Sequence, residues 1–320
     1  MVGTAAGRYL RAMTTFEGLA ATQRGAGVGP IERRGLLRAT GADARDYLHR
    51  MLTQAVKGLA AGETRYTCLL TAKGHLVAEG HLLGLADGLL LDLDPLALAE
   101  ARATLERFVI ADDVTFQDLS QTHAAVPVLG PGAAAAVAAL GLAGAAVIED
   151  GRRGAPARVL VLPAGEAVEA RARLLAGGTA SLAAADLESL RIAGGFARFG
   201  LDMGPERLPM EAGLTRSAIA FDKGCYVGQE VVLRATVRGQ IQKGLVQLAL
   251  PPEVGAGSAL RVGGAEVGAV TSAADGPEGR LGLAIVKRSA WPAGTRLATD
   301  GGEAVVRRLL VEEPPPAAAL

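Results

Sequence analysis

The sequence predicts an α+β protein in which two similar α+β layers are followed by a small antiparallel β-barrel or sandwich. Three observations support this fold class. Apolar runs with strand and helix spacing alternate over residues 35–118, a similar alternation returns over 124–193, and short apolar runs separated by Gly- and Pro-rich turns follow over 244–311. Mixed strands and helices build layered units, whereas evenly spaced short strands build barrels or sandwiches.

The first layer, residues 29–122, is predicted in the order βαββ(β)αβ, which is ferredoxin-like or related. Asp43 caps its first helix, and a tight turn at 72–75 joins two strands into a hairpin. Asp94 and Pro95 open its second helix. The predicted elements are the strand 35–39, the helix 43–52, the strands 66–71, 76–83 and 88–93, the helix 95–108 and the strand 114–119.

The second layer, residues 123–243, repeats this alternation and then loses all clean periodicity after residue 193. Residues 194–243 carry aromatic and charged side chains, which argue against disorder, and a long irregular stretch inside a compact protein favours a functional role. The predicted elements are the strand 125–129, the helix 131–140, the strands 147–148 and 157–162, and the helices 165–175 and 181–192.

The barrel or sandwich is expected over residues 244–312, with disordered segments at both ends of the chain. Residues 1–28 are rich in Gly and Ala and are predicted to be a disordered leader, with an organellar transit peptide as the alternative. Residues 313–320 include three consecutive prolines and are predicted to be a disordered tail.

The composition argues against several classes of protein. Lys plus Arg and Asp plus Glu both number 33, so no global charge attracts nucleic acid or an anionic membrane. No segment reaches the roughly 18 uninterrupted apolar residues of a membrane span. The two cysteines, Cys68 and Cys225, form neither a disulfide framework nor a four-ligand zinc site. We therefore expect a cytoplasmic protein with no direct nucleic-acid partner, no membrane and no metal site.

The octapeptide Lys223–Glu230, with the sequence K-G-C-Y-V-G-Q-E, concentrates the candidate chemistry. Lys223 lies two residues from Cys225, and a nearby cation favours the thiolate, which is the nucleophilic and metal-binding form of cysteine. We predict both residues to be catalytic, with Lys223 lowering the thiol pKa or holding an anion. The alternatives are a Cys225 that is a small buried hydrophobe beside a turn and a Lys223 that is a solvated surface lysine.

The octapeptide resembles the K-G-C-[FY]-x-G-Q-E signature of the YgfZ-type folate-binding proteins, which are relatives of the glycine-cleavage aminomethyltransferase. Other segments resemble the family in matching order over about residues 31–310. They are T-G-A-D-A-R-D-Y-L at 40–48, L-T-A-K-G-H-L at 70–76, L-R-I-A-G-G at 190–195, F-G-L-D at 199–202 and P-M-E-A-G-L at 209–214.

The resemblance implies two α+β layers and a β-barrel around a central hole of folate size. It implies tetrahydrofolate or a one-carbon derivative as cofactor. It also implies a role in synthesis or repair of iron–sulfur enzymes, with effects on tRNA modification, and iron–sulfur client enzymes or assembly proteins as partners. A transient cluster fits this role, but a permanent one does not, because such clusters need about four thiolates and the chain has two.

The resemblance also suggests folate contacts. Arg191 and Glu211 match family positions near the hole. Arg234 belongs to a local excess of cations that suits the carboxylates of a folate, a phosphate backbone or an acidic client. Gly224 and Gly228 let the backbone turn tightly or approach a ligand. The remaining motif residues are expected either to contact the ligand or to pack and pair locally, and these are Tyr226, Gln229 and Glu230.

Three functions stay open: an accessory protein acting through Cys225, a folate-dependent one-carbon transferase, and a non-catalytic folate- or client-binding module. The resemblance implies an Asp near the start of the helix 96–108, but Glu100 and Glu106 are the only acids of that helix. Asp92 and Asp94 precede the helix, and the sequence does not place either of them at the reacting atom. Glycine-cleavage aminomethyl transfer is therefore disfavoured. The octapeptide precedes the barrel, where several parts of the chain converge, and we expect it to line the central cavity.

Overall fold

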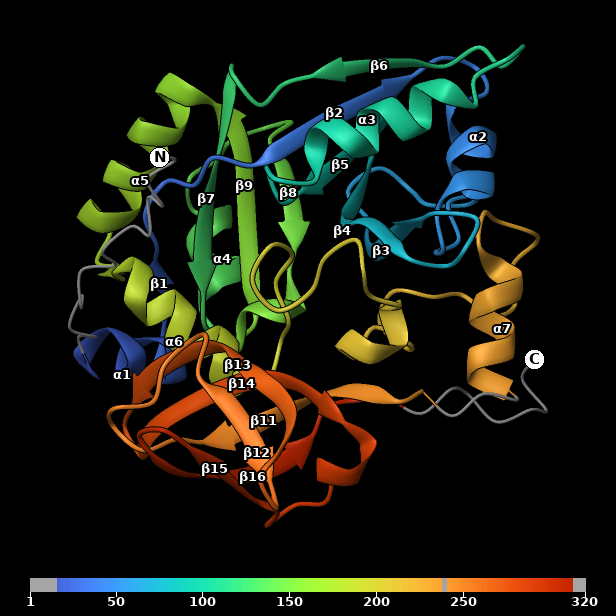
Figure 1. Cartoon of the computed structure of the whole chain (residues 1–320). Helices are drawn as coiled ribbons and strands as arrows, with labels where there is room; N and C mark the ends of the chain where they lie inside the picture. The colour runs from blue at the N-terminus through green and yellow to red at the C-terminus, as the bar shows by residue number, and fades with distance from the viewer. Residues whose placement is uncertain (1–15, 238–240, 313–320) are drawn as a thin grey trace, which may run out of the picture.

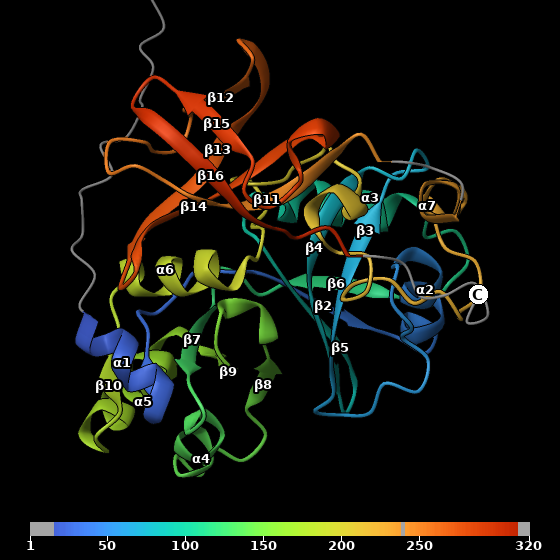
Figure 2. The same cartoon turned by 90° about the horizontal axis from the view of Figure 1, so that it is seen from below.

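The computed structural model describes residues 16–237 and 241–312, which form two five-stranded sheets with their helices and a closed six-stranded barrel (Figures 1 and 2). The α+β class and the antiparallel barrel are confirmed. The α-helices are α1 Phe16–Arg24, α2 Ala44–Met51, α3 Leu98–Arg107, α4 Ala133–Ala138, α5 Ala164–Ala176, α6 Ala184–Gly194 and α7 Gln229–Val237.

The first sheet has the strand order β3-β4-β5-β2-β6, and all its neighbours are antiparallel. Leu48 of α2 and Leu105 of α3 are fully buried in the core of this layer. Each strand and helix predicted between residues 35 and 119 is present. The strands are β2 Gly35–Thr40, β3 Thr64–Leu70, β4 Leu76–Leu85, β5 Gly88–Leu93 and β6 Thr115–Asp118.

The second sheet, in the order β10-β1-β7-β9-β8, takes one of its inner strands from the start of the chain. The prediction of a disordered leader is wrong for residues 16–28, because they form α1 and β1. Val28 is fully buried, and a Cβ on Gly27 would lie 2.8 Å from Leu182, so this glycine permits close packing. The strands are β1 Gly27–Val28, β7 His123–Leu129, β8 Ala146–Glu149, β9 Ala157–Pro163 and β10 Ala180–Ser181. Residues 1–15 and the predicted tail at 313–320 lie outside the described residues.

The C-terminal strands close into a barrel rather than a sandwich, because β11 pairs with both β14 and β16. The barrel lies below the second sheet in Figure 1, with α6 packed against β13 and β14. One strand, β15, was not predicted, since it is short and half of its residues are exposed. The strands are β11 Lys243–Ala249, β12 Ala259–Val262, β13 Ala265–Gly276, β14 Gly279–Lys287, β15 Arg296–Thr299 and β16 Gly302–Leu309.

The irregular stretch at 194–243 contains the short 3-10 helix Pro209–Ala212 and the unpredicted helix α7. Met210, Tyr226 and Val232 from this stretch are buried in the core of the first layer. The stretch therefore covers the first layer, and α7 lies near α2 and β3 in both views (Figures 1 and 2). No helix within 16–237 or 241–312 is long and apolar enough to cross a membrane.

Candidate functional site

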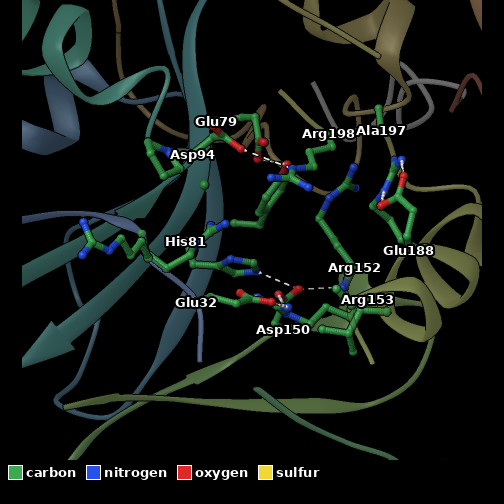
Figure 3. Close-up of a pocket in the computed structure, with 18 of the residues that line it drawn as sticks. Glu32, Glu79, His81, Asp94, Asp150, Arg152, Arg153, Glu188, Ala197 and Arg198 are labelled. Atoms are coloured by element: carbon green, nitrogen blue, oxygen red, sulfur yellow. Dashed lines mark hydrogen bonds and ion pairs between the residues drawn. The ribbon is translucent and has the colours of Figure 1, made fainter. Parts of the chain in front are cut away.

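A cavity of about 360 Å³ lies where the first layer, the loop after β8, the segment 30–34 and α6 meet (Figure 3). This volume falls in the range of about 300–1,000 Å³ that is usual for small-molecule sites. Many of its lining residues are charged, so charges and hydrogen bonds are available to a ligand there. The charged and aromatic lining residues are Glu32, Arg33, Arg34, Tyr66, Glu79, His81, Asp94, Asp150, Arg152, Arg153, Glu188, Arg191 and Arg198.

One wall of the cavity is a closed network of ion pairs, visible below His81 in Figure 3. Arg153 holds both carboxylate oxygens of Glu32 at 2.8 Å and one oxygen of Asp150 at 2.7 Å. The other Asp150 oxygen lies 3.4 Å from His81 Nε2. Burial alone would raise the pKa of Glu32, but the Arg153 guanidinium outweighs it and lowers that pKa. These contacts join the loop after β8 to the segment 30–34 and to β4, so this wall links the two layers.

Arg191, predicted to contact folate, lines the cavity but is fully occupied by protein partners. Its guanidinium donates to both oxygens of Glu188, to Asp202 Oδ2 at 2.7 Å, to Ser272 Oγ at 2.8 Å and to the Phe196 carbonyl. These bonds use all five N–H donors of the side chain. Arg191 therefore joins α6 to the barrel and leaves no donor for a ligand carboxylate.

The adjoining wall carries groups with unused hydrogen-bonding capacity, and the rings of Tyr66 and His81 lie 5.0 Å apart where the two walls meet. Glu79 on β4 accepts a hydrogen bond from the Tyr66 hydroxyl through Oε2. Among the described residues, its Oε1 is the single carboxylate oxygen of the cavity acids without a donor. The Arg152 guanidinium stacks on the Tyr66 ring at 4.4 Å and near the Phe196 ring at 5.1 Å, and its one side-chain hydrogen bond within the described chain, to Ser217 Oγ, is long at 3.4 Å.

Two further groups lie near this wall. Asp94 is buried and accepts from the Leu96 amide at 3.0 Å, while its other oxygen lies 3.4 Å from Arg198 Nε. The Arg198 side chain is half exposed. The helix 96–108 contains no Asp, but Asp94, which precedes α3, and Glu79 both place acids in the cavity (Figure 3).

The octapeptide Lys223–Glu230 lies outside this cavity, so the expectation that it lines the cavity is wrong. Cys225 is exposed, which overturns the alternative of a buried hydrophobe. The Lys223 ammonium donates to three backbone carbonyls at the end of α2, those of His49, Leu52 (2.6 Å) and Gln54 (3.1 Å). Partial burial lowers the pKa of Lys223 to about 8.

The remaining residues of the octapeptide separate by role. Tyr226 is buried in the first-layer core, and burial raises the pKa of its hydroxyl. Gly228 has φ +84°, and a Cβ there would lie 2.6 Å from the Thr71 carbonyl oxygen, so this position needs glycine. Gly224 has open space around it, so the expected need for a glycine in a tight turn does not apply there.

The other predicted folate contacts do not reach the cavity. Glu211, half-buried, accepts weakly from the Leu208 amide at the start of the 3-10 helix, and burial raises its pKa. Gln229 and Glu230 begin α7, and Glu230 pairs with Arg234 one turn later on an exposed face. Short-range hydrogen bonds and helix pairing explain these residues without a ligand.

The sequence analysis missed Tyr66, Glu79 and Arg152. Glu79 carried a usable signal, because it is the only acid in the strand L-V-A-E-G-H-L-L-G-L, in which His81 is the one other polar side chain. A charged residue in such a strand is rarely buried without a partner or a role. Arg152 gave no such signal, because its contacts are with the rings of Tyr66 and Phe196, which are distant in sequence.

Comparisons with known proteins agree with this fold. A family model, the GCVT N-terminal domain, matches residues 11–146. A putative chloroplastic transferase of Arabidopsis thaliana is 27% identical over 86% of this chain and 68% of its own length. The tRNA-modifying protein YgfZ of Vibrio vulnificus is 28% identical over 68% of each chain. The crystal structure of the glycine cleavage system aminomethyltransferase T from Bartonella henselae superposes with TM-score 0.82 at 23% identity, covering 93% of this chain and 89% of that one.

Proposed function

We propose that the chain is a YgfZ-type member of the aminomethyltransferase superfamily, which the family model and the YgfZ relatives support, and that it binds tetrahydrofolate in the central cavity. We propose further that it serves as an accessory protein in the synthesis or repair of iron–sulfur enzymes, with indirect effects on tRNA modification. In this proposal Cys225 acts on client proteins or assembly proteins at the surface.

The observation that carries the folate proposal is the open wall of the cavity. A reduced pterin presents several N–H donors on one flat ring, and Glu79 Oε1 is an acceptor with no protein donor among the described residues. Arg152 offers a flat cation beside Tyr66, and Arg198, half exposed, is available to a carboxylate of the folate tail. The groups present therefore fit the chemistry of a folate.

The folate proposal is tested by titration calorimetry with tetrahydrofolate on the full chain. The Glu79→Gln variant keeps an acceptor for Tyr66 but replaces the open oxygen with an N–H₂ donor. We expect its affinity to fall by about tenfold or more, the effect of losing a hydrogen bond to a charged group. Glu100→Gln on the exposed face of α3 is the matched control and should bind like the wild type. Absence of binding to the wild-type chain contradicts the proposal.

The client role is tested separately, by the activity of a [4Fe–4S] enzyme under oxidative stress in cells that depend on this chain. Cys225→Ser should lose the protection that the wild type gives. Full protection by Cys225→Ser would contradict the proposed role of Cys225 and would leave the folate proposal unaffected.

A second candidate function is a folate-dependent one-carbon transferase. Glu79 and Asp94 favour it, because a carboxylate beside a bound folate can hold or move a proton at a ring nitrogen. Purified chain with tetrahydrofolate and a methylated or aminomethyl donor should then show turnover that Glu79→Gln abolishes. Lack of turnover with binding intact would leave the accessory role.

A further inference from the structure

Lys223 and Cys225 are neighbours in sequence, but the structure gives the lysine a different partner. The last turn of a helix leaves backbone carbonyls without hydrogen-bond donors. The Lys223 ammonium donates to the carbonyls of His49, Leu52 and Gln54, at and just after the end of α2. An ammonium has three N–H donors, so these bonds use all of them, and a cation at this end of a helix also complements its dipole.

The chain on the other side of Cys225 is fixed as well. The Tyr226 ring lies 5.1 Å from the Lys223 ammonium and is buried in the first-layer core. Gly228 packs against the turn at 71–75, where only glycine fits. Between these fixed points Gly224 has no atom near its Cβ position and Cys225 is exposed. The loop therefore has anchored ends and a projecting tip.

We infer that Lys223 is a positioning residue, which fastens the loop to the end of α2 so that the Cys225 thiol is presented outward to a partner protein. It donates no hydrogen bond to the thiol or to an anionic substrate, because all three of its N–H donors bond to carbonyls of residues 49–54. This inference rests on the proposed function only in assigning a role to Cys225. The anchoring itself is independent of that role.

The test compares Lys223→Met, which keeps the length of the side chain and removes its donors, with Lys223→Arg, which keeps a charged donor. Lys73→Met, an exposed lysine on the adjacent turn, is the control. The amides of Ala220 and Gln229, which donate to the carbonyls of Thr53 and Tyr226, flank the loop and report on its anchoring. In Lys223→Met we expect their hydrogen exchange to accelerate by about ten- to hundredfold, as expected for losing bonds to a charged group. Lys223→Arg should restore much of the protection, and Lys73→Met should change nothing.

The second readout is the pH dependence of Cys225 alkylation by a neutral reagent. If Lys223 only positions the loop, Lys223→Met leaves the midpoint of that profile unchanged. A shift of the midpoint to higher pH, with hydrogen exchange unaltered, would show that Lys223 activates the thiol and would overturn the inference.

The third readout separates this inference from the proposed function. Tetrahydrofolate affinity should be the same in Lys223→Met and wild type, because the loop lies outside the cavity. Protection of the [4Fe–4S] enzyme should be lost in both Lys223→Met and Cys225→Ser. If Cys225→Ser protects fully, the client role fails, while the exchange data still decide whether Lys223 anchors the loop. Unchanged exchange in Lys223→Met overturns the inference whatever the client result.

Discussion

The cavity and the octapeptide contain similar kinds of side chain in opposite arrangements. In the cavity, acids and arginines from distant parts of the chain converge, and most of them pair with each other. In the octapeptide, contiguous residues diverge: Lys223 reaches α2, Tyr226 enters the core, and Cys225 and Glu230 are exposed. The stretch of sequence with the most reactive side chains therefore does not line the cavity. The wall that suits a ligand was identified by the groups there that have few protein hydrogen bonds, Glu79 and Arg152.

The largest effect on stability is expected from a substitution that breaks an ion pair lining the cavity. Arg191→Ala removes a guanidinium with five protein bonds and leaves the buried Asp202 carboxylate without its cation. Removing one partner of a buried ion pair typically costs about 3–5 kcal/mol of unfolding free energy. Arg234→Ala, at an exposed pair on α7, should cost at most about 0.5 kcal/mol. Urea unfolding measures both, and equal effects would contradict the distinction drawn between the two arginines.

A smaller effect on stability is expected from substitutions of the two glycines of the octapeptide. Gly228→Ala places a side chain at φ +84° and against the Thr71 carbonyl, with an expected cost of about 1–3 kcal/mol. Gly224→Ala meets no neighbouring atom and should change stability by less than about 0.5 kcal/mol. Thermal unfolding of the two variants decides the point. A Gly224 variant as unstable as the Gly228 variant would show that the tip of the loop is not free.

The smallest effect concerns pH. The pKa of Lys223 is lowered by burial to about 8 in the folded chain, against an ordinary value of 10.5. Between these two pH values the unfolded chain binds more protons than the folded one, so the contribution of Lys223 to stability rises with pH in that window. The difference in unfolding free energy between wild type and Lys223→Met should therefore increase from pH 8 to pH 10. A decrease would mean that the carbonyl acceptors hold the proton more strongly than burial opposes it.

The sequence predicted the first layer and most of the barrel well, because their apolar periodicity is local. It failed for β1, a two-residue strand whose place depends on Leu182 and on β7, far along the chain. It also failed for α7, which follows a stretch of mixed polarity. Arg191 lines the cavity, and its hydrogen bonds to Glu188 and Asp202 depend on packing that the sequence does not show. That Glu79 keeps an oxygen without a donor among the described residues likewise depends on which partners the other acids find.

The central claim is that the folate cavity and the Cys225 loop are separate sites. The most direct measurement is the affinity of tetrahydrofolate for Cys225→Ser, determined by calorimetry beside wild type and Glu79→Gln. The account predicts that Cys225→Ser binds with wild-type affinity while Glu79→Gln binds about tenfold or more weakly. A loss of folate affinity in Cys225→Ser, with Glu79→Gln unaffected, would contradict it.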